Sequence, residues 1–276
     1  MDNFDLRKYL AEGRLFKEDS KDDLQTSMGK DVSSFRSDLS KYAQDPKVKA
    51  VLSMGGEEYD GDENDDKLPY TSTKLAVKNL IPTQSEIGFD QSVRGDLDDE
   101  YNSLKGIFQG APDMGSPIVT YAGKYIIDGH HRWSAVFAAN PGANMDALDI
   151  KAKSGFQPVD ILKAVHTAIA VELGKVPSAD PKGINIMGGV DYETVLAKVN
   201  EFLNDKAAKI WAENGHKTKE EIAKFLTKTL NLIAKKGYVS GAPGREDMPQ
   251  TDADKTKSQT KLDALATGKI NINKPF

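Results

Sequence analysis

The sequence predicts an α+β protein, because short strand-like runs fill its middle while helix-like periodicity dominates on both sides. Apolar runs bounded by turn formers between residues 75 and 153 indicate strands. Apolar residues recur every three or four positions in 4–50 and 156–240, which indicates helices. We therefore predict an N-terminal helical segment, an acidic linker, a small mixed-sheet domain, a helical domain and an extended tail, at residues 1–56, 57–70, 71–154, 155–240 and 241–276.

Composition limits the classes of function. The chain has 276 residues, 38% of them hydrophobic, which is enough for one large domain or two ordinary ones. It has no cysteine, which excludes disulfides, zinc thiolate sites and thiol nucleophiles. A net charge of −5 argues against broad coating of nucleic acid. Apolar runs are too short for a membrane span and "MDNFDLRKYL" lacks a signal-peptide pattern, so we expect a cytoplasmic protein without a membrane partner.

The acidic run "EEYDGDENDD" at 57–66 invites comparison with a calcium-binding EF-hand loop. Asp60, Asp62 and Asn64 match the first three ligand positions. Asp65 then takes the place of the required glycine, and Thr71 takes the place of the bidentate glutamate. We interpret this run as a solvated linker.

The mixed-sheet domain is predicted to alternate strands and helices. A strand ends at Pro82, a helix ends at Gly110, a hairpin follows, and a helix starting near His130 ends before Pro141. The predicted elements are strand 74–82, helix 96–110, hairpin 116–129 with its turn at 122–124, helix 130–140 and strand 147–152. Beyond them, the periodicity predicts helices over 158–174, 191–215 and 218–237.

The stretch "IIDGHHRWSA" at 126–135 carries the candidate site. An apolar strand passes into Asp128 and Gly129, and the predicted helix places the following residues at its N-terminus. Backbone N–H groups and the helix dipole favour an anion such as phosphate there. Arg132 adds a planar fork of donors, while Asp128 either caps the helix or helps to hold a magnesium ion. The alternative to a phosphate site is a capped helix that binds no ligand. The spacing of Trp133 assigns its side chain to the core.

The same motif resembles the ParB/sulfiredoxin-like superfamily. "DGHHRWSA" follows the hairpin "PIVTYAGKYII" and, about 45 residues upstream, "LAVKNLIPTQSE". In that superfamily a strand ending in proline opens the domain, and a Gly-x-(His/Arg)-Arg turn binds nucleotide phosphates. The resemblance covers roughly residues 72–154. It implies a small mixed-sheet domain that binds a nucleotide.

Differences from the branches of this superfamily indicate which branch the chain resembles most. Sulfiredoxins carry a cysteine where this chain has His130, so sulfinic acid reduction is excluded. ParB partition proteins resemble the chain at Gly129, Arg132 and Trp133, but their Glu-Asn-x-x-Arg box is not found here. The sequence at 128–133, Asp-Gly-His-His-Arg-Trp, is most similar to the corresponding loop of the archaeal ADP-dependent free serine kinases.

The kinase resemblance implies roles for individual residues. Glu86 becomes the catalytic base, with Gln84 as the alternative occupant of that position because Glu86 lies four residues after Pro82. Asp128 and His130 join it as catalytic residues. Gly129, His130, His131 and Arg132 become the phosphate loop, with Asp128 as a Mg²⁺ ligand. The cofactors implied are ATP, ADP or another nucleotide together with Mg²⁺, and the phosphate acceptor is a small molecule or a nucleic acid.

Two other classes of function stay open. One is a ParB-like module that binds or processes DNA, with the nucleotide as a switch; the other is a phage structural protein that keeps the fold. The opening "MDNFDLRKYLAEGRLF" faintly resembles N-termini of marine bacteriophage proteins, which would place the protein in the host cytoplasm. Residues 74–154 hold eight basic and ten acidic residues, so DNA binding requires that the lysines of 206–236 gather on one face.

The C-terminal part of the sequence holds further candidate motifs and histidines. Residues 218–237 have the outline of a helix-turn-helix, but no breaker follows Leu226, so one continuous helix is favoured. His166 and His216 are interpreted as structural. In the tail, "GREDMPQTD" offers a possible second segment that returns to the phosphate site through Arg245, Asp247 and Gln250.

Overall fold

The computed structural model describes residues 70–99, 103–115, 117–152, 154–163, 165 and 184–244. Contacts divide the chain into two compact units, and the candidate site lies in the unit formed by Thr71–Asp149 and Asp180–Arg245. In the other unit, the described residues include a helical stretch from 158 to 163. The backbone N–H of Gln157 donates to the Asp160 carboxylate at 2.8 Å at the start of this stretch. No described helix is long and apolar enough to cross a bilayer.

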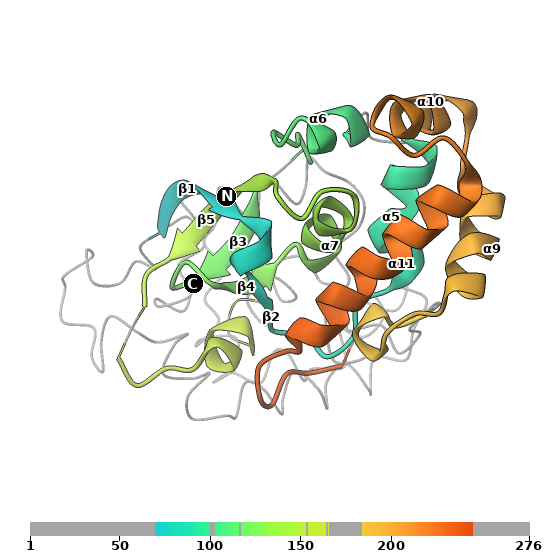
Figure 1. Ribbon diagram of the computed structural model, residues 1–276. Coiled ribbons are helices and arrows are strands. Elements are labelled where there is room, and N and C mark those ends of the chain that lie inside the picture. Colours follow the sequence, from blue (N-terminus) through green and yellow to red (C-terminus); the bar gives the residue numbers. More distant parts are fainter. Residues whose placement is uncertain are drawn as a thin grey trace, which may run out of the picture. The chain divides into compact units, whose positions relative to one another are not determined.

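Helices and a mixed five-stranded sheet make this an α+β protein (Figure 1). The strand order is β1-β5-β3-β4-β2; β3 and β4 pair antiparallel, and β2 and β4 pair parallel. The strands are β1 (Tyr70–Ala76), β2 (Ile81–Pro82), β3 (Ile118–Tyr121), β4 (Tyr125–Asp128) and β5 (Asn144–Ile150). The predicted hairpin is confirmed: Ala122 and Gly123 have φ of 56° and 65°, as the tight turn requires.

The single strand predicted over 74–82 is wrong. It is divided into β1 and β2, which lie at opposite edges of the sheet, by the 3₁₀ turn η2 (Val77–Asn79). Val77 explains the break, because its N–H donates to the Ala143 carbonyl at 3.1 Å and its carbonyl accepts from Trp133 Nε1 at 2.9 Å. Both partners lie far along the chain, and together they divert the backbone.

The helix predicted over 96–110 also differs from the structure. Helix α5 (Phe89–Asp98) begins earlier and ends where Asp99 takes a left-handed φ of 50°. The separate short helix α6 (Leu104–Phe108) follows. The helix predicted after the hairpin is confirmed as α7 (His130–Ala139).

The C-terminal region of this unit forms three helices where two were predicted. Residues 191–215 contain α9 (Tyr192–Phe202) and α10 (Asp205–Glu213). The Asn204 side chain accepts from Ala207 N–H and thereby caps a new helix, which ends the first one. The continuous helix favoured over a helix-turn-helix is confirmed as α11 (Lys219–Lys236), and a capping box of Thr218 and Glu221 starts it.

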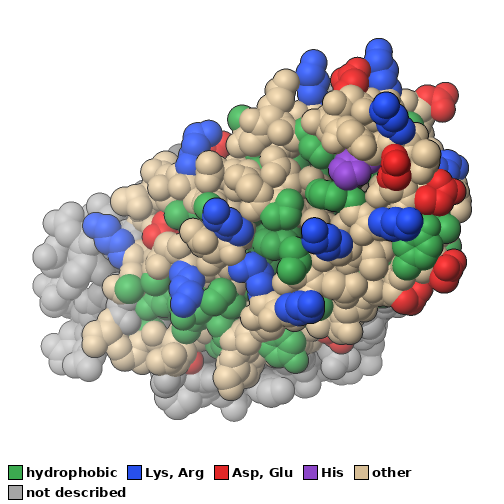
Figure 2. Space-filling model, viewed as in Figure 1, with side chains coloured by type: hydrophobic (Ala, Val, Ile, Leu, Met, Phe, Trp, Pro, Cys, Tyr) green, Lys and Arg blue, Asp and Glu red, His purple; other side chains and the backbone are tan. Residues whose placement is uncertain are grey.

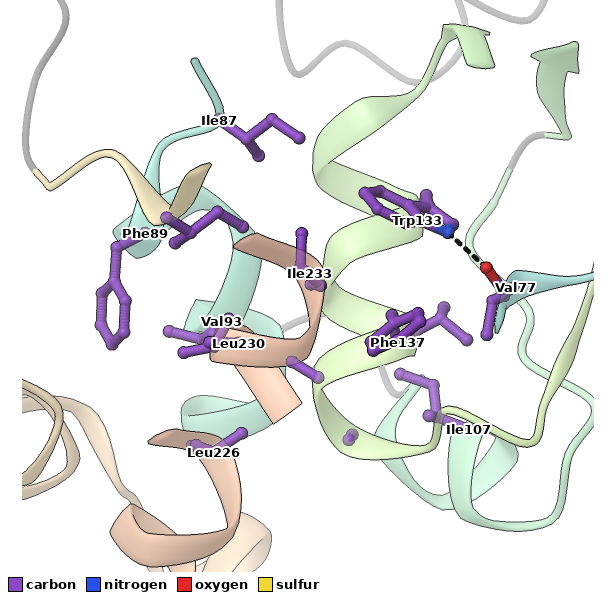
Figure 3. Close-up of a cluster of buried hydrophobic side chains, with 14 of the residues drawn as sticks. Val77, Ile87, Phe89, Val93, Ile107, Trp133, Phe137, Leu226, Leu230 and Ile233 are labelled. Carbon is purple, nitrogen blue, oxygen red and sulfur yellow. Dashed lines mark hydrogen bonds between the residues drawn. The ribbon is translucent and has the colours of Figure 1, made fainter. Parts of the chain in front are cut away.

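One hydrophobic core joins the sheet domain to these helices (Figure 3). Phe89 and Val93 of α5, Trp133 and Phe137 of α7, and Leu226, Leu230 and Ile233 of α11 all belong to it. Residues 180–240 of the predicted helical domain share one compact unit with residues 71–149 of the predicted sheet domain, whereas residues 155–179 belong to the other unit. Helix α11 packs against α7 and α9, and α5 packs against α7, so this core holds the helix that carries the candidate site.

Candidate functional site

The strand-to-helix turn at 128–132 has the predicted form. Strand β4 ends at Asp128, Gly129 is the N-cap with a left-handed φ of 91°, and α7 begins at His130. A Cβ at Gly129 would lie 2.7 Å from Ile118 Cγ2 and 2.8 Å from Arg132 Nη2, so only glycine fits. The positive end of the α7 dipole is directed at this turn, which makes it favourable for an anion.

Asp128 does not cap α7. Its Oδ2 instead accepts from Arg132 Nη2 at 3.1 Å, one helical turn away, and the two side chains are 18% and 21% exposed. The pair fixes the guanidinium over the turn. Because a guanidinium carries several N–H donors, this geometry permits it to bind a phosphate oxygen while it remains paired with Asp128.

The two adjacent histidines brace a second segment, residues 83–88, against the start of α7. The buried His130 ring accepts the N–H of Thr83 on Nε2 at 3.1 Å, and Thr83 also donates its hydroxyl to the Ile126 carbonyl. His131 accepts the N–H of Gly88 on Nε2 at 3.2 Å. Accepting nitrogens have no proton, so this hydrogen-bond network assigns both rings the neutral Nδ1–H form.

Two residues that sequence reasoning missed hold the middle of the 83–88 segment. Asn185 accepts the N–H of Ile87 at 3.1 Å and donates to the Ser85 carbonyl at 3.2 Å. The Pro243 carbonyl accepts both the N–H and the hydroxyl of Ser85, each at 3.0 Å. Asn185 and Pro243 lie about 100 and 158 positions from their partners. No local sequence signal marks either one.

The 83–88 segment contains both candidates for the catalytic base, Gln84 and Glu86. Gln84 is only 2% exposed, and its Oε1 is buried with no hydrogen-bond partner among the described residues. A buried amide oxygen of this kind calls for a donor from water or a ligand. Glu86 is half-buried. An amide cannot take up a proton at ordinary pH, so of the two only Glu86 can serve as a base.

The donor set at the turn is compatible with Mg²⁺ only if the ligand supplies most of the oxygens. Within the described ranges, no group of three or more His, Asp or Glu side chains is arranged to hold a metal. Asp128 is the carboxylate at the turn. Mg²⁺ is commonly held by one or two carboxylates together with substrate phosphates, and Asp128 fits that pattern.

The other predicted ligand positions do not join this site in the described part of the chain. His216 packs against Trp211 and Phe225, with ring centroids 5.4 and 4.5 Å away, and burial lowers its pKa. This agrees with a structural role. The acidic run at 57–66, His166, and the set Arg245, Asp247 and Gln250 lie outside the described residues.

No family model matches the chain, and a search of curated proteins finds no significant relative.

Proposed function

We propose that the protein binds a nucleotide and transfers or hydrolyses its terminal phosphoryl group, as a member of the ParB/sulfiredoxin type. One observation carries the proposal: the 83–88 segment is hydrogen-bonded at both ends to the first residues of α7. This bonding holds the segment that carries Glu86 beside the turn at 128–132, which supports the assignment of both to one site. The sequence resemblance of the turn to nucleotide-binding loops supports the same conclusion.

Phosphoryl transfer asks a protein mainly for positioning and charge neutralisation. The N-terminus of α7 and Arg132 hold the phosphates, and Gly129 lets them lie close to the backbone. Glu86 takes the proton from the attacking hydroxyl or water as its oxygen bonds to phosphorus, while the bond from phosphorus to the leaving nucleotide oxygen breaks. Mg²⁺ held by Asp128 and the phosphates would neutralise charge on the phosphoryl group.

The histidine rings have a positioning role in this scheme. The Nε2 atoms of His130 and His131 accept backbone N–H groups, so in this arrangement they hold the segment that carries Glu86. Protonation of either ring would remove an acceptor and release one end of that segment. We therefore assign phosphate contact at these two positions to the backbone.

A thermal-shift and turnover screen of nucleotides with Mg²⁺ tests the proposal. A nucleotide at a hundred times its Kd stabilises the folded state by about 2.7 kcal/mol, which raises Tm by roughly 5–10 °C in a domain of this size. If no nucleotide raises Tm, the proposal is wrong.

The catalytic role of Glu86 needs its own variants. Glu86→Gln should retain nucleotide binding and lose about a hundredfold or more in turnover, because general base catalysis contributes about 10²–10⁴-fold. Gln84→Glu is the matched exchange at the alternative position and should not restore turnover when combined with Glu86→Gln. Full turnover by Glu86→Gln would exclude this carboxylate as the base.

A further inference from the structure

Helix α11 carries a row of exposed lysines on the side away from the core. Lys224, Lys228 and Lys235 are exposed, and helical geometry places them within an arc of about 40° over about 16 Å. Figure 2, viewed from the side of α11, shows blue side chains spread across this face while red ones gather mainly toward its right-hand edge. Three of the five lysines of this helix therefore lie on one face.

Carboxylates neutralise only the start of this row, where Glu220 lies four residues before Lys224 and attracts it. The two acidic residues of α11 lie in its first turn, and the carboxylate of Glu221 accepts the backbone N–H groups of Lys217 and Thr218. Elsewhere in the described unit, lysines do pair: Lys198 with Asp90 at 3.2 Å and Lys206 with Asp99 at 2.7 Å. No such pair involves Lys224, Lys228 or Lys235 among the described residues.

Repulsion within this row of lysines destabilises the folded helix, and the row contributes little to the structure in return. Like charges one turn apart, as in Lys224 and Lys228, destabilise a helix, whereas only Lys235 gains from the negative end of the helix dipole. Lys228 and Lys235 have no ion-pair partner among the described residues, and in a chain of net charge −5 an anionic partner explains why they are kept.

Two exposed apolar side chains accompany the lysines and identify the kind of anion. Leu232 lies one helical turn after Lys228, at the side of the row, and is 40% exposed; Tyr238 follows the helix by two residues and is 50% exposed. These are the two large hydrophobic residues that are exposed in the described part of the chain. Proteins that bind single strands combine a basic track for the backbone with aromatic rings on which bases stack.

We propose that the Lys224–Lys228–Lys235 face of α11, with Tyr238 as a stacking platform, binds single-stranded nucleic acid without sequence preference. The lysines contact phosphates, and Tyr238 stacks on an unpaired base. A duplex would use the lysines but offers no unstacked base to Tyr238, so the single strand is favoured. The inference goes beyond nucleotide binding at the 128–132 turn and does not depend on it.

Fluorescence anisotropy with a labelled oligothymidine probe, over a range of salt concentrations, tests this surface. Each lysine that contacts a phosphate of a single strand contributes about 0.7 to the slope of log affinity against log salt. Lys228→Gln should therefore bind about fivefold more weakly at 0.1 M salt, and the triple Gln variant on the order of a hundredfold. Lys219→Gln is the matched control, because Lys219 is exposed on the same helix but about 140° away from Lys224.

Tyrosine variants separate stacking from charge. Tyr238→Ala should weaken binding about five- to a hundredfold with the salt slope unchanged, and Tyr238→Phe should bind as wild type. All of these residues are exposed, and a circular dichroism melt verifies folding. Absence of binding at low salt, or wild-type affinity and slope in the triple variant, would overturn the proposal. Equal binding of a duplex that is indifferent to Tyr238→Ala would overturn the single-strand assignment.

Discussion

Gly129 offers a quantitative test of the geometry at the strand-to-helix turn. Gly129→Ala forces an L residue to a φ of 91°, which costs about 1–2 kcal/mol. The new Cβ would also approach Ile118 Cγ2 to 2.7 Å, and overpacking of a core costs about 1–3 kcal/mol more. We therefore expect a total loss of about 2–5 kcal/mol in the free energy of unfolding.

Gly215 provides the matched control for this substitution. Its φ is 93°, and a Cβ there would meet nothing within 4 Å, so Gly215→Ala carries the conformational cost without the clash. Urea unfolding followed by the fluorescence of Trp133 and Trp211, both fully buried, measures the two losses. The loss at Gly129 should exceed that at Gly215 by at least about 1 kcal/mol. Equal losses would refute the close packing of the turn.

Two further predictions concern α5 and α10. Burial, with Asp98 and Asp99 adding repulsion, raises the pKa of Asp96 well above its ordinary value, so the native state binds its proton more tightly than the unfolded state. The stabilisation from this proton is full below the ordinary pKa of an aspartate and is lost as pH rises toward the raised pKa of Asp96 in the native state. Asp96→Asn should abolish this loss, which urea titrations across pH measure. An unchanged pH profile in this variant would contradict the prediction. Asn204→Ala should cost about 1 kcal/mol by removing the cap of α10, Asn204→Ser should cost less, and equal losses would exclude capping as the cause.

Elements with local signals were predictable from the sequence. The hairpin at 118–128 follows from its apolar runs and the Ala-Gly-Lys turn, and α11 follows from its periodicity and the capping box at Thr218. The turn at 128–132 was predictable for the same reason, because strand, glycine and helix follow one another directly.

Features fixed by distant contacts were not predictable. The division of β1 from β2 depends on Trp133 Nε1 bonding to the Val77 carbonyl, 56 residues away. The clamp on the 83–88 segment depends on Asn185, which no nearby pattern distinguishes from a loop asparagine. The brace formed by His131 requires Gly88 to lie against α7, which only the packed structure places there.

Nucleotide titration of Arg132 variants tests the central claim most directly. Arg132→Ala should lower nucleotide affinity by about ten- to a hundredfold, because a charged hydrogen bond contributes about 1.5–3 kcal/mol. Arg132→Lys should restore only part of it, since an ammonium lacks the planar fork. Loss of the partly exposed pair with Asp128 should cost folding about 1 kcal/mol or less, measured by urea unfolding of the same samples. A normally folded Arg132→Ala protein with wild-type nucleotide affinity would contradict the assignment of this turn as a phosphate site.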